Sequence, residues 1–293
     1  MPSAIDSPSK PEQGLCKLPI FAPVRARLSQ IFLSKPDARR LTAIVALDPA
    51  ITAELLAAAN SRAYGRAFQV YTAAEAIDIL GWDETERMAQ LAFDAQARFK
   101  PEIIQAFIRS HWAHSLACAL VASELARFFS LPEERAFALG MLHDIGAWGL
   151  MAQSPDAYRQ LFIQGSSTSI EKLGAEECLM GINHCKAGSW LINSWGLPEE
   201  FAEATAMHYG AAVKGAPNVA AIVSVACRWA DALGYQAGHA ERVSVRDAIR
   251  CAPARVIPDL TAASTEIGRR CRAKMLEHAR EFDEETVKFV GKL

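Results

Sequence analysis

The sequence has no apolar run that approaches the roughly 18 residues needed to span a bilayer, so no membrane association is expected. Its first residues, MPSAIDSPSKPEQG, lack the basic start and the apolar block of a signal peptide. Its seven cysteines never form a CxxC pair, which argues against a disulfide framework and against a zinc ribbon. These absences predict a reduced, cytoplasmic protein.

Neither sign of charge dominates, because the formal net charge of the 293 residues is only −2, and no nucleic-acid partner is expected. The chain also lacks a glycine-rich phosphate loop and a GxSxG elbow. Alternating runs of Val, Ile and Thr are scarce, whereas 51% of the residues are hydrophobic. We therefore predict an all-α fold, a multi-helix bundle with a substantial core.

Helix start and stop signals are frequent in the first third of the chain. Asp48 followed by Pro49 predicts an N-cap and a first helical residue. Thr72 and Glu75 have the spacing of a capping box, and Gly81 is placed to end the helix that they open.

Similar signals continue through the middle of the chain. Ser130 with Glu133 predicts a second capping box, which opens a helix toward His143. The run LPEE at 197–200 predicts the start of a helix that carries His208, and a further helix is expected from Asn218 to about Leu233.

We divide the chain into four parts. Residues 1–14 are rich in Ser, Pro and charge and are expected to be disordered. Residues 15–100 form an N-terminal helical subdomain, and residues 101–240 form an HD-like helical bundle. Residues 241–293 are charged and helical, and are expected to form a C-terminal extension that packs partly on the bundle.

Six imidazole and carboxylate side chains lie in segments that otherwise have the pattern of apolar helices: His114, His143, Asp144, His184, His208 and Asp231. Such groups are ligands for divalent metals, and burying one without a partner is costly. A single buried histidine is more often a hydrogen-bonded core residue, but the whole set favours a metal centre over a metal-free polar network. His111 fits a partly exposed helix position and receives no role.

The segments LPIFAPVRARLSQIF, LDPAITAELLAAANSRAYG and AAEAIDILGW, with HDIG at 143–146 and WGLP at 195–198, resemble the HDOD domain. This domain is the HD-related output domain of bacterial signalling proteins, within the HD and HD-GYP phosphohydrolase superfamily. The resemblance covers about residues 15–240. It implies that Asp144 bridges two metals, with His114, His143 and Asp231 on one side and His184 and His208 on the other.

The sequence also departs from the HD-GYP pattern. Ala147 stands where that pattern has a lysine, three residues after Asp144, and no Gly-Tyr-Pro stretch follows His208. Ser110 stands where some members have a glutamate for a further metal. Lys186 and Arg228, close in sequence to proposed ligands, are candidates for meeting an anion at the mouth of the site.

Three functions therefore stay open. The resemblance and the missing lysine favour a regulatory module that acts through a signalling protein partner and holds one or two divalent ions, such as iron, manganese or zinc, for structure or sensing. The retained ligands allow instead a metal-dependent phosphohydrolase acting on a cyclic dinucleotide or nucleotide. A third reading gives the six residues only a hydrogen-bonded network that ties the bundle together.

Overall fold

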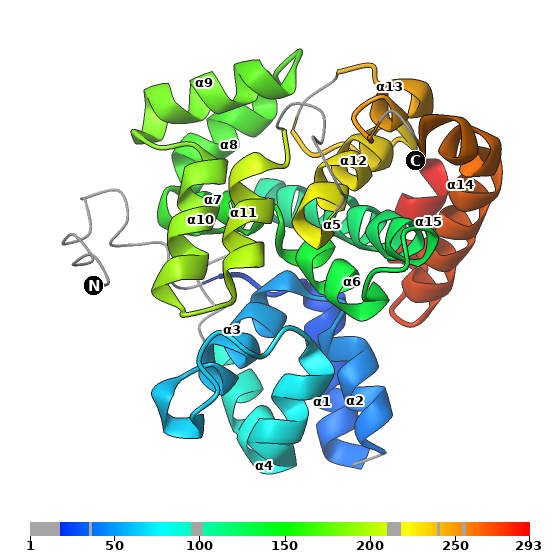
Figure 1. Cartoon of the computed structure of the whole chain (residues 1–293). Coiled ribbons are helices and arrows are strands. Elements are labelled where there is room, and N and C mark those ends of the chain that lie inside the picture. Colours follow the sequence, from blue (N-terminus) through cyan, green and yellow to red (C-terminus); the bar gives the residue numbers. More distant parts are fainter. Residues whose placement is uncertain (1–17, 35–36, 95–101, 210–217, 239–240, 254–255) are drawn as a thin grey trace, which may run out of the picture.

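The computed structural model describes residues 18–34, 37–94, 102–209, 218–238, 241–253 and 256–293. All helix and strand assignments in these ranges are helical, which confirms the all-α prediction (Figure 1). The expectation of disorder at residues 1–14 and the boundary at residues 100–101 lie outside the described residues.

The first helices form one group, which lies below the central bundle in Figure 1. They are α1 (Ala22–Ser34), α2 (Ala38–Val45), α3 (Pro49–Ala59), the short 3-10 helix η2 (Arg62–Tyr64) and α4 (Ala73–Asp94). Asp48 caps α3 as predicted, because its carboxylate accepts from the backbone N–H groups of Ala50 and Ile51 at 2.9 and 3.0 Å.

The predicted capping box at the start of α4 is also present. The Glu75 carboxylate accepts from the Thr72 N–H at 3.0 Å, and the Thr72 hydroxyl accepts from the Glu75 N–H at 3.2 Å. Gly81 then interrupts α4 with φ 76° and ψ 170°, a conformation that glycine adopts without steric cost. Helical structure resumes after this kink and continues to Asp94, so Gly81 separates two helical segments.

The central bundle surrounds α5, which runs through the middle of the molecule (Figure 1). Its members are α5 (Glu102–Phe128), α6 (Glu133–Leu142), α7 (Ile145–Gln153), α8 (Pro155–Gln164), α9 (Ser169–Met180), α10 (His184–Ser194), α11 (Glu199–Met207) and α12 (Val219–Ala232). Helices α6 and α12 pack on α5, and α7 packs on α10. The predicted helices that lead to His208 and Asp231 are α11 and α12.

The second predicted capping box is wrong. Ser130 adopts a left-handed conformation with φ 56°, and Pro132 takes the N-cap position of α6 without a side-chain bond. The Glu133 carboxylate instead accepts from the guanidinium of Arg127, with 3.0 Å between Nε and Oε1. An ion pair to the preceding helix has replaced the local cap that the sequence spacing predicts.

The last helices are α13 (Val245–Ile249), α14 (Ile257–Arg280) and α15 (Glu284–Lys292). Helix α14 packs along α5, where the Arg270 guanidinium lies 2.8 Å from the buried Glu124 carboxylate. The Phe282 ring packs edge-on against Phe21 and Trp112. One hydrophobic cluster joins buried residues from Leu18 to Val290, so the division into subdomain, bundle and extension stays a prediction.

Among the described residues, no single helix has both the length and the apolar character to cross a membrane. The helices Ala38–Val45 and Pro49–Ala59, bent by 115° at the break between them, meet the same test only when they are counted together.

Candidate metal centre

The structure brings the six predicted residues together in the interior of the bundle, where none is more than 5% exposed. His114 lies within α5 and Asp231 within α12, on helix faces as the sequence predicts. The other four are placed at helix ends rather than mid-helix. His143 is the C-cap of α6, Asp144 the N-cap of α7, His184 the first residue of α10 and His208 the C-cap of α11.

Two glycines allow the helices to approach closely enough to assemble this cluster. A Cβ at Gly140 would lie 2.5 Å from the Ala119 Cα in α5, and a Cβ at Gly146 would lie 1.9 Å from the His184 carbonyl oxygen. Both obstacles are backbone atoms, which cannot rotate away. The glycine of HDIG is therefore required by the contact between α7 and α10, which sets Asp144 beside His184.

His114 and His143 form the first facing pair. Their Nε2 atoms lie 3.2 Å apart. Each Nδ1 is within 2.7 Å of a backbone carbonyl, that of Tyr235 for His114 and that of Gly140 for His143. A carbonyl oxygen only accepts, so each Nδ1 carries a proton and each neutral ring directs an Nε2 lone pair into the gap. Burial lowers the pKa of His143, which favours this neutral form.

His184 and His208 form the second facing pair, again with 3.2 Å between their Nε2 atoms. His208 donates from Nδ1 to the Thr205 carbonyl at 2.9 Å, and His184 from Nδ1 to the Glu176 carboxylate at 2.5 Å. Burial lowers the pKa of His184, but the surrounding negative charges, Glu176 first, together outweigh it and raise this pKa to about 10. In the metal-free protein, a protonated His184 therefore donates from Nε2 to His208.

Helix ends account for this orientation. The last carbonyls of a helix have no intrahelical partner. Gly140 and Thr205 lie three residues before His143 and His208, and their carbonyls accept from these rings. A partner at Nδ1 fixes the ring and directs Nε2 to a metal, as in known metal sites.

Asp144 is the least satisfied buried group of the cluster. Its side chain is 1% exposed, and neither carboxylate oxygen has a hydrogen-bond partner. Its oxygens lie 3.5 Å from Nε2 of His184 and 3.7 Å from Nε2 of His111. Burial raises the pKa of Asp144, but the positive charges of Lys172 and His184 outweigh it and hold this pKa well below its usual value. A buried, ionised and unsatisfied carboxylate is a group that a cation would complete.

Asp231 stands behind His114. Its Oδ1 lies 3.5 Å from Nδ1 of His114, the ring atom that faces away from His143. Burial raises the pKa of Asp231 well above its usual value. Its assignment as a direct ligand therefore stays a prediction, and its position is that of a group that orients His114.

Two cysteines complete the surroundings of the histidines, and sequence reasoning missed both. Sγ of Cys227 lies 3.6 Å from Nε2 of His114, and Sγ of Cys185 lies 3.9 Å from Nε2 of His208. The available signals were the spacing of Cys227, one helical turn before Asp231, and the position of Cys185 directly after His184.

Three charged or polar residues were missed as well. His111 is fully buried, contrary to the expectation of a partly exposed position. Its Nε2 lies 3.5 Å from Nζ of Lys172, a 4% exposed lysine that also donates to the Ala237 carbonyl at 2.9 Å. Glu176, one turn after Lys172 on α9, accepts from the Tyr158 hydroxyl at 2.9 Å as well as from His184.

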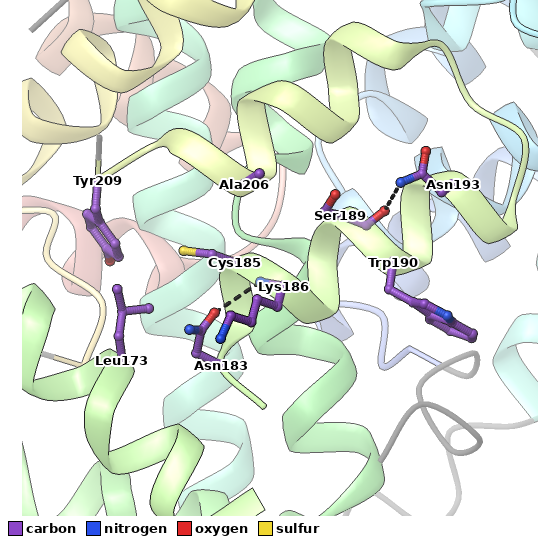
Figure 2. A pocket seen from close by; sticks show the side chains of 9 residues that line it. All are labelled: Leu173, Asn183, Cys185, Lys186, Ser189, Trp190, Asn193, Ala206 and Tyr209. Carbon is purple, nitrogen blue, oxygen red and sulfur yellow. Dashed lines mark hydrogen bonds between the residues drawn. The ribbon is translucent and has the colours of Figure 1, made fainter. Parts of the chain in front are cut away.

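A pocket of about 600 Å³ opens beside the second pair (Figure 2). Cys185, Lys186 and Tyr209 are among the residues that line it. The Lys186 ammonium is paired with Glu177 at 2.5 Å, which offsets its charge. Arg228 does not line this pocket, and its Nε is buried without a hydrogen-bond partner. The anion role of both residues stays a prediction.

The donor set fits a divalent metal. Metal–nitrogen bonds of about 2.0–2.1 Å place two imidazole nitrogens about 3.4 Å apart in a tetrahedral site. The observed Nε2 separations of 3.2 Å are close to that value. The unsatisfied Asp144 oxygens supply the negative charge that such a site needs.

Solved structures share this fold. The chain is similar to the MmoQ response regulator of Methylococcus capsulatus, with 24% identity, a TM-score of 0.67, and 81% and 94% of the two chains covered. It is also similar to a virulence factor of Campylobacter jejuni, with 16% identity, a TM-score of 0.64, and 96% and 97% covered. No curated protein matches the chain.

The family model of the HDOD domain matches residues 18–211, which include the N-terminal helices and five of the six predicted ligands; only Asp231 lies beyond the match. The chain therefore belongs to the HDOD family.

Proposed function

We propose that this chain is a regulatory module of bacterial signal transduction, which acts through a protein partner and holds a divalent metal at its buried centre. Membership of the HDOD family supports the signalling role. The similar structure described as a response regulator is consistent with it.

The observation that carries this proposal is the enclosure of the centre. His114, His143, Asp144, His184 and His208 are each 1% exposed. The site that HD-GYP enzymes fill with lysine is occupied by Ala147, which is fully buried. A phosphate ester reaching the histidines would therefore have to displace packed side chains, and would meet no lysine there. A small cation needs only the space between the facing Nε2 atoms.

The metal would be held by Nε2 of the four histidines and by the Asp144 carboxylate. These ligands come from α5, the α6–α7 junction, α10 and the end of α11. Binding would join helices that are distant in sequence, so the metal would supply stability to the bundle. Its presence or absence could then be read by a partner as a difference in the packing of these helices.

The test compares the wild type with the double variant His143→Ala/Asp144→Ala, both purified without chelator and without an affinity tag that carries nickel. We expect one or two metal ions per wild-type chain and none in the variant, measured by elemental analysis. Helical circular dichroism of both proteins controls for folding. Wild-type protein that contains no metal and takes up none on dialysis would contradict the metal part of the proposal.

The partner is tested separately, by cross-linking capture from cells with the same two proteins. We expect one protein to be enriched with the wild type and reduced at least fivefold with the variant. Capture that is equal for both proteins would show that the centre does not govern the interaction.

A second candidate, a metal-dependent phosphohydrolase, has the pocket beside Cys185 as its specific support. A metal bound there would supply Lewis acidity to a phosphate ester. Its test is hydrolysis of cyclic dinucleotides and nucleotides by the metal-loaded protein, with the His143→Ala/Asp144→Ala variant as control. Turnover by the wild type alone would favour this candidate over the regulatory module.

A further inference from the structure

We propose that Cys185 and Cys227 are metal ligands, so that the centre consists of two triads of two histidines and one cysteine, and that it takes zinc in preference to iron or manganese. The inference rests on the proposed metal centre and adds two donors to it. The first triad is His114, His143 and Cys227, and the second is His184, His208 and Cys185.

In each triad, the three donor atoms lie within 4.8 Å of one another. In the first, the nitrogens are 3.2 Å apart, and Sγ lies 3.6 Å from Nε2 of His114. Zinc bond lengths of about 2.0–2.1 Å to nitrogen and 2.3 Å to sulfur give a nitrogen–sulfur edge of about 3.5–3.6 Å in a tetrahedral site. Two edges of the triad therefore have lengths close to those of a zinc tetrahedron, and the third is within the 4.8 Å limit.

The second triad is slightly wider. Its nitrogens are also 3.2 Å apart, and Sγ of Cys185 lies 3.9 Å from Nε2 of His208. An Asp144 oxygen lies 3.5 Å from Nε2 of His184, on hand as a further donor. Because this oxygen has no hydrogen-bond partner, a cation bound there would displace no hydrogen bond of Asp144, and it would replace the proton that His184 shares with His208.

The Cys227 thiol and the Asp231 carboxylate lie at opposite nitrogens of the His114 ring, and this placement decides which of the two can be a metal ligand. Sγ of Cys227 lies against Nε2, which faces His143. The Asp231 carboxylate lies against Nδ1, on the opposite side. The resemblance to HD-GYP proteins assigns the ligand role to the aspartate, but this geometry gives it to the cysteine one turn earlier on α12.

The donor chemistry decides the metal. Thiolate is a soft ligand that favours zinc, whereas sites built from carboxylate and water suit manganese and magnesium. One sulfur and two imidazoles per ion is a donor set that zinc accepts in tetrahedral geometry. We therefore expect zinc to be retained when equal concentrations of manganese or ferrous iron compete.

The experiment uses the full chain, stripped with chelator under reducing conditions and reloaded with cobalt. Cobalt bound to thiolate gives a sulfur-to-metal charge-transfer band in the near ultraviolet. We expect this band in the wild type, at about half intensity in Cys185→Ser and in Cys227→Ser, and absent from the double variant. Cys271→Ser is the matched control, because Cys271 is also buried but lies in α14 without a histidine beside its sulfur among the contacts described.

A second measurement does not depend on variants that fold. X-ray absorption at the zinc edge of the wild type should show about one sulfur neighbour per ion, at about 2.3 Å. Bound metal with only nitrogen and oxygen neighbours, or a band that persists in the double variant, would overturn the thiolate ligands and leave the proposed metal centre intact. A wild type that binds neither cobalt nor zinc would overturn the metal centre itself.

Discussion

The N-terminal helices and the centre of the bundle both bury polar side chains, but they satisfy them in opposite ways. Asn60, which is 2% exposed, makes four hydrogen bonds to backbone groups of its own segment. Asp48 accepts from three backbone N–H groups, those of Phe21, Ala50 and Ile51. The polar atoms of these two side chains are satisfied by the chain itself.

At the centre, three backbone carbonyls and the Glu176 carboxylate accept from only the outer Nδ1 atoms of the histidines. Their Nε2 atoms face one another at 3.2 Å, and Asp144 has no hydrogen-bond partner for either oxygen. The difference shows what each set does. A closed network holds a fold in one conformation, whereas a rigid set of open donors is arranged for something that the chain does not contain.

The largest effect is expected where the backbone itself holds the centre together. In Gly146→Ala, the new Cβ would meet backbone atoms of His184 and Gly188 at 1.9 and 2.5 Å, so α7 and α10 must separate. We expect a loss of about 3–5 kcal/mol in the free energy of unfolding. Metal binding should fall with it, because Asp144 and His184 depend on this contact. Urea denaturation and elemental analysis measure both quantities.

The matched control is Gly174→Ala on α9. A Cβ there has no atom within 4 Å, so the substitution should be neutral or stabilise the helix by up to about 1 kcal/mol. Equal destabilisation of the two variants would mean that the close approach of α7 and α10 is not what Gly146 provides.

The next prediction compares Asn60, in the N-terminal hydrogen-bond network, with His143, in the metal centre. Asn60→Ala leaves the buried N–H and carbonyl groups of Val70 without their side-chain partner, and we expect a loss of about 3 kcal/mol with or without metal. His143→Ala should instead lose the increment that metal adds, about 2.7 kcal/mol at a metal concentration 100 times the Kd. Denaturation of each variant with chelator and with zinc distinguishes them. A metal increment that survives in His143→Ala would show that the metal lies elsewhere.

The sequence predicts the hydrogen-bonded caps of the N-terminal helices well, and the residues of the metal centre only in part. Asp48 with Pro49 and Thr72 with Glu75 act on adjacent residues, so local spacing reveals them. Lys172 and Glu176 have the i, i+4 spacing of a solvated helical ion pair, and only the packing of α9 against α5 and α10 buries them. Cys185 and Cys227 become neighbours of histidines through helices distant in sequence. Their spacing from His184 and Asp231 marks the two cysteines as candidates, but their contacts with His208 and His114 come only from the packing of separate helices.

Glu54 is an exception within the N-terminal group, because it is largely buried without an ion pair among the described residues. Burial, reinforced by the Asp48 charge, raises its pKa to about 7 from 4.5. The folded protein therefore binds a proton that the unfolded chain releases near pH 4.5, and this contribution to stability is lost as pH rises through about 7.

Glu54→Gln should remove that loss. We expect the variant to be more stable than the wild type by about 1–2 kcal/mol at pH 8, after allowance for solvent screening, with the difference vanishing below pH 4.5. Thermal unfolding from pH 4 to 8 gives the two curves. Parallel curves over this range would place the Glu54 pKa near its ordinary value.

The smallest expected effect concerns Lys172, whose positive charge already lies inside the centre. The Lys172 ammonium, held by the Ala237 carbonyl and facing His111, lowers the pKa of Asp144 and so favours its ionised form. Lys172 therefore stabilises the metal-free centre and repels a divalent ion. Lys172→Met should bind zinc about three- to tenfold more tightly, while the metal-free variant unfolds more easily. Titration against a chromophoric chelator measures the affinity.

Lys186→Met is the matched control. It removes an equal charge that is 66% exposed and paired with Glu177, so it should leave the affinity unchanged. If Lys172→Met instead weakens zinc binding, the lysine orients the ligands, and its positive charge is not what limits the affinity of the centre.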